Sequence, residues 1–181
     1  RAKNIKYVPH HIAHACNVMY QSIIQSSLIV SFDGGSDNGH FNIYLGDKGK
    51  EPELIFKSQV DLCVPYAAIG HYLKDIKRED NIWKGNLTYA GKIMGLSAYG
   101  KRVDEFFEYT KKLYDISNCN NVNIHHKNWT EIYCSCIKEG QVAWNIAYAN
   151  QYAFEKKFAD LAIPFILQYP DRQLQFSGGG S

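Results

Sequence analysis

Three histidines lie close together near the start of the chain, in the sequence His-His-Ile-Ala-His-Ala from His10 to Ala15. In a helix, His10 and His14 project from one face, one turn apart. Two imidazoles at this spacing can chelate one divalent ion. His11 points elsewhere, and we interpret it as a proton donor or a group beside the site. The alternative is a helix start whose histidines only cap and pack, but the motif favours metal binding or catalysis.

A second group, Asp33-Gly34-Gly35-Ser36, lies between two predicted strands. Backbone N–H groups in such a turn can hold phosphate oxygens. Asp33 at the strand end would suit a metal-bound water or would fix the turn. An ordinary β-hairpin explains these residues as well, since Asp-Gly is a common turn signal.

Two further segments are rich in glycine. In Gly91–Gly100, Lys92 can reach an anionic ligand, although lysines on short helices are usually only solvated. In Phe176–Ser181, Gly178 and Gly179 would let the backbone approach a purine or a phosphate. A flexible tail or a linker has the same composition, but the strand that precedes these glycines favours a nucleotide turn.

The elements that position these residues follow from hydrophobic periodicity and turn residues. We predict strands over 5–8, 27–32, 40–45, 53–60 and 172–176, helices over 11–24, 65–76, 88–96, 104–114 and 142–167, and a polar loop over 118–129. The strands from 27 to 60 would form a glycine-rich meander, followed by helices and a last strand. This order indicates the α/β class.

Composition restricts the class of protein. The 181 residues, 45% of them hydrophobic, are enough for one sizeable core. A net charge of +2, with basic residues spread along the chain, disfavours a nucleic-acid partner. No apolar run approaches a membrane span, so we expect no membrane partner. Five cysteines and no visible signal peptide predict a reducing, cytoplasmic location.

In this order, the four segments resemble the O-carbamoyltransferases of nodulation-factor and antibiotic biosynthesis. In that family a strand leads into His-His-x-Ala-His-Ala, here His10 to Ala15, and then comes an Asp-Gly-rich hairpin, here Asp33 to Asp37. A Lys-x-Met-Gly-Leu-(Ala/Ser)-x-Tyr-Gly segment follows, here Lys92 to Gly100. Last comes a strand ending in a double glycine, here Leu174 to Gly179. The resemblance covers nearly the whole chain, and its first and third motifs are specific.

The resemblance implies an actin-like ATPase fold, which is ribonuclease-H-like and related to the tRNA threonylcarbamoyladenosine enzymes. Residues 1–26 would end the first actin-like subdomain. Residues 27–181 would form most of the second, truncated at its nucleotide turn. The family has further strands, a third, acidic metal ligand after the glycines and a domain that makes the carbamoyl-adenylate. We therefore expect a partial copy that is only part of the active unit.

The resemblance also implies a function. A carbamoyl group would pass from carbamoyl phosphate, through a carbamoyl-adenylate made from ATP, to a hydroxyl of a small molecule. His10 and His14 would bind a divalent metal, with iron(II) expected, and His11 and Asp33 would be catalytic. The residues expected to contact the nucleotide are Asp33, Gly34, Gly35, Ser36, Lys92, Gly178 and Gly179. We also expect that the chain can form a homodimer.

Two other functions are compatible with parts of the pattern. The first is a non-catalytic nucleotide- or protein-binding module of the same fold, which the incomplete ends favour and the adjacent imidazoles disfavour. The second is a related transferase acting on tRNA, which the balanced charge disfavours because phosphate contacts need clustered Lys and Arg.

Overall fold

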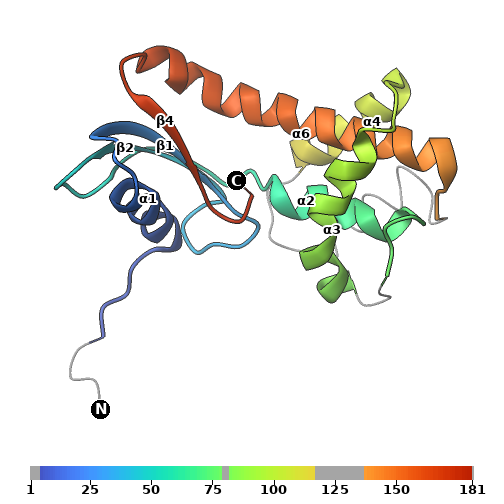
Figure 1. Cartoon of the computed structure of the whole chain (residues 1–181), viewed down its shortest axis with the longest axis horizontal. Helices are drawn as coiled ribbons and strands as arrows, with labels where there is room; N and C mark the ends of the chain where they lie inside the picture. Colours follow the sequence, from blue (N-terminus) through green and yellow to red (C-terminus); the bar gives the residue numbers. More distant parts are fainter. Residues whose placement is uncertain (1–4, 79–81, 117–136, 181) are drawn as a thin grey trace. The chain divides into compact units, whose positions relative to one another are not determined.

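The computed structural model describes residues 5–78, 82–116 and 137–180 (Figure 1). The chain forms two compact units, one from Arg1–Gln59 with Ala162–Ser181 and one from Val60–Leu161. Strands and helices are mixed, which confirms the α/β class. The predicted subdomain boundary after residue 26 stays a prediction, and the predicted loop at 118–129 lies outside the described residues.

The first unit contains a mixed four-stranded sheet with the order β3-β2-β1-β4. Its strands are β1 (Ser26–Phe32), β2 (Phe41–Asp47), β3 (Glu53–Ser58) and β4 (Gln173–Ser177). β1, β2 and β3 are antiparallel neighbours, which confirms the predicted meander. β4 pairs in parallel with β1, with Val30 opposite Phe176. The last predicted strand therefore lies beside the first strand of the meander.

Helix α1 (His10–Gln21) packs on one face of this sheet (Figure 1). Pro9 precedes its first residue with a φ of −56°, which is already close to a helical value. Ala15 and Met19 bury the side of the helix that faces the sheet, where they meet Ile29 and Tyr44. Because this apolar side of α1 faces the sheet, the polar residues of the helix lie on its other sides.

The segment 5–8 forms no strand, so that prediction was wrong. Ile5 is 91% exposed and Tyr7 is 73% exposed, and within the described part of the chain no strand pairs with them. A short apolar run becomes a strand only where a neighbour accepts its backbone hydrogen bonds and covers its side chains. Here both are lacking.

The second unit is helical. It contains α2 (Cys63–Ala68), the 3₁₀ helix η1 (Ile69–Tyr72), α3 (Ile82–Ser97), α4 (Asp104–Ile116) and the first part of α6 (Gly140–Gln168). The helix predicted over 65–76 is thus two short helices. In its core the Tyr114 hydroxyl donates a hydrogen bond to Asn150 at 2.8 Å. No helix among the described residues is long and apolar enough to span a membrane.

The contact between α1 and the sheet can be tested by truncating Met19, which is 1% exposed. We expect Met19→Ala to lower the free energy of unfolding by about 2–5 kcal/mol, because the lost side chain leaves a cavity. Urea denaturation followed by circular dichroism measures the change. Ile23→Ala, at a side chain that is 92% exposed, should change it by less than about 0.5 kcal/mol. Equal effects of both substitutions would contradict this packing.

Candidate metal centre

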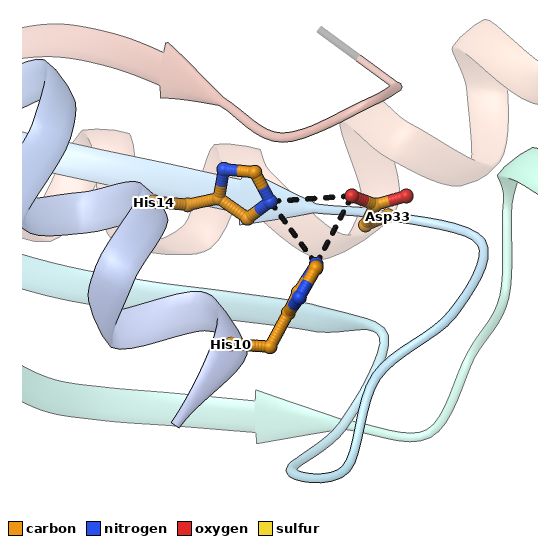
Figure 2. A group of neighbouring side chains, drawn as sticks. All are labelled: His10, His14 and Asp33. Atoms are coloured by element: carbon orange, nitrogen blue, oxygen red, sulfur yellow. Dashed lines mark hydrogen bonds and ion pairs between the residues drawn. The ribbon is translucent and has the colours of Figure 1, made fainter. Parts of the chain in front are cut away.

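His10, His14 and Asp33 converge on one point (Figure 2). The Nε2 atoms of the two histidines are 3.0 Å apart. The Asp33 Oδ2 atom lies 3.1 Å from the His10 nitrogen and 3.2 Å from the His14 nitrogen. These three atoms, one carboxylate oxygen and two imidazole nitrogens, form a nearly equilateral triangle.

The triangle has the size that one divalent ion requires. Three ligand atoms at mutual right angles and about 2.1 Å from an ion are about 3.0 Å from one another. Two histidines and one carboxylate on one side of an ion form the facial set of non-haem iron(II) sites, which leaves positions open to other ligands. The side chains of His14 and Asp33 are 29% and 24% exposed, so a molecule can approach them. The residues present therefore fit a divalent metal.

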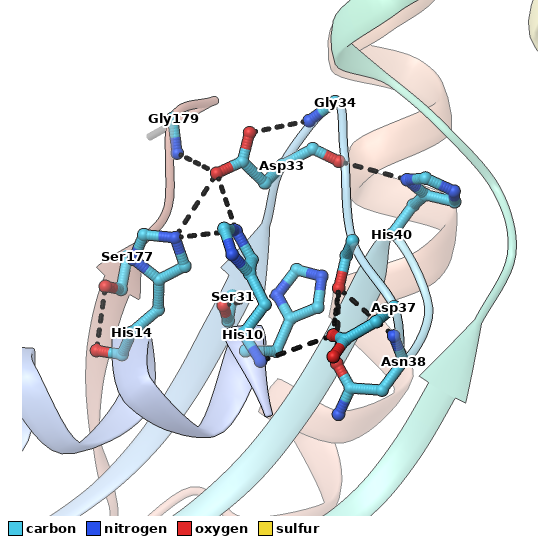
Figure 3. Close-up of polar contacts among 12 residues, drawn as sticks. His10, His14, Ser31, Asp33, Gly34, Asp37, Asn38, His40, Ser177 and Gly179 are labelled. Carbon is cyan, nitrogen blue, oxygen red and sulfur yellow. Dashed lines mark hydrogen bonds and ion pairs between the residues drawn. The ribbon is translucent and has the colours of Figure 1, made fainter. Parts of the chain in front are cut away.

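Asp33 is held by backbone groups from two different segments (Figure 3). The N–H of Gly34 donates to its Oδ1 atom at 2.7 Å, and the N–H of Gly179 donates to its Oδ2 atom at 3.1 Å. Burial raises the pKa of the carboxyl, but the Gly179 N–H, the His10 side chain and the Gly34 N–H lower it below its usual value. The group is thus an anion at neutral pH, as a metal ligand must be.

His11 is completely buried, and both of its ring nitrogens are hydrogen-bonded. Its Nε2 lies 2.9 Å from the carbonyl oxygen of Gly39, which can only accept, so this nitrogen carries the proton. Its Nδ1 lies 2.7 Å from the Ser31 hydroxyl and accepts from it. Burial lowers the pKa of His11 to about 4. The geometry supports a positioning role, in which the neutral ring ties α1 to β1 and to the following loop, and the catalytic role stays a prediction.

The loop after Asp33 lies beside the histidines. The Ser36 hydroxyl is turned into the loop itself, where it lies 3.2 Å from the Asn38 Oδ1 atom. Asp37 accepts a hydrogen bond from the N–H of His10 at 3.3 Å, which joins the loop to the start of α1 (Figure 3). Gly35 has open space where a Cβ would lie. The predicted phosphate contacts of Gly34, Gly35 and Ser36 stay predictions.

His40 is a functional candidate that sequence reasoning missed. Its ring is 2% exposed, and its Nδ1 lies 3.3 Å from the carbonyl oxygen of Asp33. The backbone N–H of Asp33 in turn donates to the carbonyl oxygen of His40 at 3.1 Å. These two bonds hold the backbone of Asp33, the candidate metal ligand. A single histidine at the start of a predicted strand gave no signal of this role.

Gly178 and Gly179 lie next to the centre, at the end of β4. Gly178 has a φ of +110°, and a Cβ on it would lie 2.2 Å from the carbonyl oxygen of Phe32. Only glycine fits this position without a shift of the backbone. Lys92 lies in the second unit, exposed on α3, with its Nζ 5.9 Å from the centre of the Tyr89 ring. Nucleotide contacts by these three predicted residues stay predictions.

The comparison with protein-family models gives no match, and the comparison with curated proteins gives none either. The resemblance to O-carbamoyltransferases therefore rests on the motifs alone.

The glycine turn should control metal affinity through Asp33. We expect Gly178→Ala to displace the turn, to remove the Gly179 hydrogen bond and to weaken metal binding about tenfold or more, as loss of a group that orients a ligand does. Competition with a chelating dye measures the affinity. Gly35→Ala is the matched control, because nothing lies within 4 Å of its added Cβ. If both variants bound metal like the parent chain, the turn would have no part in holding Asp33.

Burial of neutral His11 should make stability depend on pH. The folded pKa of about 4 lies below the unfolded value of 6.5, so protons bind the unfolded chain more readily. The free energy of unfolding should therefore fall as pH decreases from 6.5 towards 4, by about 3 kcal/mol in all. Denaturation at several pH values measures the slope. In His11→Asn this part of the slope should vanish, and an unchanged slope would contradict the assignment.

Proposed function

We propose that this chain carries the metal-binding part of an O-carbamoyltransferase. The single observation that carries the proposal is the cluster of His10, His14 and Asp33, which has the ligand types and spacing of a divalent metal site. The Gly178–Gly179 turn, which the motif resemblance places on the adenosine side, donates a hydrogen bond to that cluster. The Asp33 carboxylate thus belongs to the candidate metal ligands and also accepts a hydrogen bond from the candidate nucleotide turn.

The sheet supports the actin-like half of the proposal. In a ribonuclease-H-like domain we expect a meander of three strands, followed by helices and a fourth strand. The fourth strand pairs in parallel with the first, and the order β3-β2-β1-β4 fits this arrangement. Parallel pairing requires a long crossover, which the chain supplies between β3 and β4.

The proposed reaction joins the oxygen of an acceptor hydroxyl to the carbamoyl carbon of carbamoyl-adenylate. The bond between this carbon and the phosphate oxygen breaks, AMP leaves, and the hydroxyl proton passes to a histidine or carboxylate base. A bound divalent metal, for which we propose iron(II), would supply Lewis-acid stabilisation of the developing oxyanion. Asp33 and the two histidines hold their nitrogen and oxygen atoms towards one point. We propose that backbone N–H groups of the turn at Gly34, Gly35 and Ser36 contact phosphate oxygens.

Carbamoyl phosphate, a small-molecule acceptor and ATP are the substrates of this proposal. It needs no nucleic acid or membrane. A homodimer and a cytoplasmic location stay predictions.

The proposal is tested by calorimetric titration with iron(II) under anaerobic conditions, followed by a non-hydrolysable ATP analogue. We expect one metal ion per chain, and we expect His14→Ala and Asp33→Asn to weaken its binding about 100-fold or more because each removes a ligand. The nucleotide analogue should bind more tightly when the metal is present. Asp171→Asn, at an exposed carboxylate, is the matched control and should bind metal like the parent chain.

Unchanged metal affinity in both ligand variants would overturn the metal centre. Metal binding without any nucleotide binding would keep the centre and overturn the carbamoyltransferase assignment.

A further inference from the structure

A group of polar contacts joins three strands at the end of the sheet opposite the metal centre. Arg172 directly precedes β4, and its guanidinium donates two hydrogen bonds to the Asp47 carboxylate, from Nη1 at 3.0 Å and from Nη2 at 3.5 Å. The Nη1 atom also lies 3.4 Å from the carbonyl oxygens of Ser27 and Gly46. Asp47 is the last residue of β2, and Ser27 is the second residue of β1. One side chain therefore ties the start of β4 to both neighbouring strands of the sheet.

The Asp47 carboxylate holds the guanidinium in one orientation. The Ser26 hydroxyl donates to its Oδ1 atom at 3.0 Å. Hydrogen bonds from Arg172 and Ser26 lower the pKa of Asp47, so this group is an anion at neutral pH. The planar guanidinium of an arginine can bind a carboxylate through two parallel bonds, whereas a lysine offers only a point charge. The contact therefore depends on the arginine side chain and not only on its charge.

The side chains of β4 do not by themselves specify its register on β1. Gln173 and Gln175 lie on one face of the sheet, and Leu174 and Phe176 lie on the other. A slide of β4 by two residues would put Gln175 in the place of Gln173. It would also put Phe176 in the place of Leu174, so each face would keep its chemical character. The register must therefore be fixed by contacts outside this alternating pattern.

The register of β4 decides whether the glycine turn reaches the metal centre. In the observed register, the Gly179 N–H donates to the Asp33 Oδ2 atom at 3.1 Å. A slide by two residues would move β4 about 7 Å along β1. A hydrogen bond does not survive a displacement of this size. Asp33 would then lose one of the two backbone donors that orient it.

Contacts at both ends hold β4 in place. Near the metal centre, the Ser177 hydroxyl donates to the carbonyl oxygen of His14 at 2.9 Å (Figure 3), and the Gly180 N–H donates to that of Phe32 at 3.3 Å. These two bonds form only when the turn is already in its place. Arg172 binds parts of β1 and β2 that the metal centre does not include, at the other end of a strand about 17 Å long. It can therefore fix the register independently of the turn.

We propose that Arg172 is a positioning residue for the metal centre. Its bonds to Asp47 and to the carbonyl oxygens of β1 and β2 set the register of β4, and this register presents the Gly179 N–H to Asp33. Groups that orient a metal ligand affect metal affinity although they do not touch the ion. The inference rests on the metal centre of the proposed function and does not depend on carbamoyl transfer.

The test measures the cobalt(II) affinity of the full chain by competition with a chelating dye. Arg172→Lys keeps the positive charge and removes the paired bonds to Asp47, so we expect about tenfold weaker cobalt(II) binding. Arg102→Lys is the matched control, because Arg102 binds the carboxylate of Asp104 at 2.7 Å within the second unit. It should bind cobalt(II) like the parent chain. Circular dichroism at the assay temperature checks that each variant is folded.

A second measurement separates positioning from a general loss of stability. In ¹H–¹⁵N spectra, the amide signal of Gly179 should move in Arg172→Lys, because this amide loses its carboxylate partner. The amide signals of Ile43 and Phe56, which pair between β2 and β3, should stay in place. Asp47→Asn should also weaken cobalt(II) binding. The double variant should bind no more weakly than the weaker single variant, since both substitutions remove the same contact.

Parent-like cobalt(II) affinity in Arg172→Lys and in Asp47→Asn would overturn the positioning role and leave the metal centre standing. A shifted Gly179 signal without weaker binding would overturn it too, because the register would then not control the centre. Equal movement of the Gly179, Ile43 and Phe56 signals would indicate general loosening of the sheet and would likewise contradict it. If the parent chain itself bound no cobalt(II), the metal centre of the proposed function would fail, and this inference with it.

Discussion

The Asp33 carboxylate joins three segments that are far apart in the sequence. It lies at the end of β1, contacts both histidines of α1 and accepts a hydrogen bond from the turn after β4. A partly buried carboxylate loses hydration, and these hydrogen bonds replace it. The helix, the central strand and the glycine turn therefore take their positions together at this one group. Loss of any of the three contacts would remove one of the bonds that position the carboxylate for the candidate metal centre.

The buried His11 side chain also helps to position α1 next to β1. Its neutral ring donates to the carbonyl of Gly39 and accepts from Ser31, so it joins the loop after Asp33 to α1 and β1. Adjacent histidines in one motif thus have different roles, because helix geometry places their side chains on different sides of α1. His10 and His14 point towards Asp33, and His14 also lines a groove between α1 and β4, whereas His11 faces the sheet. This separation explains why two of the three histidines can share the candidate metal centre while the third ties the helix to the sheet.

The parallel pairing of β4 with β1 gives the site its second wall. It brings residues 175–179 beside a helix that lies more than 150 positions earlier in the chain. The same pairing forms the groove between α1 and β4 and presents the Gly179 N–H to Asp33. The candidate metal centre and the groove beside it are therefore both consequences of the placement of one strand.

The sequence by itself determined the elements and the paired histidines, since hydrophobic periodicity and four-residue helical spacing are local properties. The α1 helix, the meander and the last strand were predicted within a few residues, whereas the strand at 5–8 was wrong because a strand depends on a partner. The position of Asp33 beside both histidines, its support by His40 and the place of Gln175 in the groove wall were decided by tertiary structure alone. Their roles depend on contacts between segments 7 to more than 150 residues apart, and no local pattern encodes such distances.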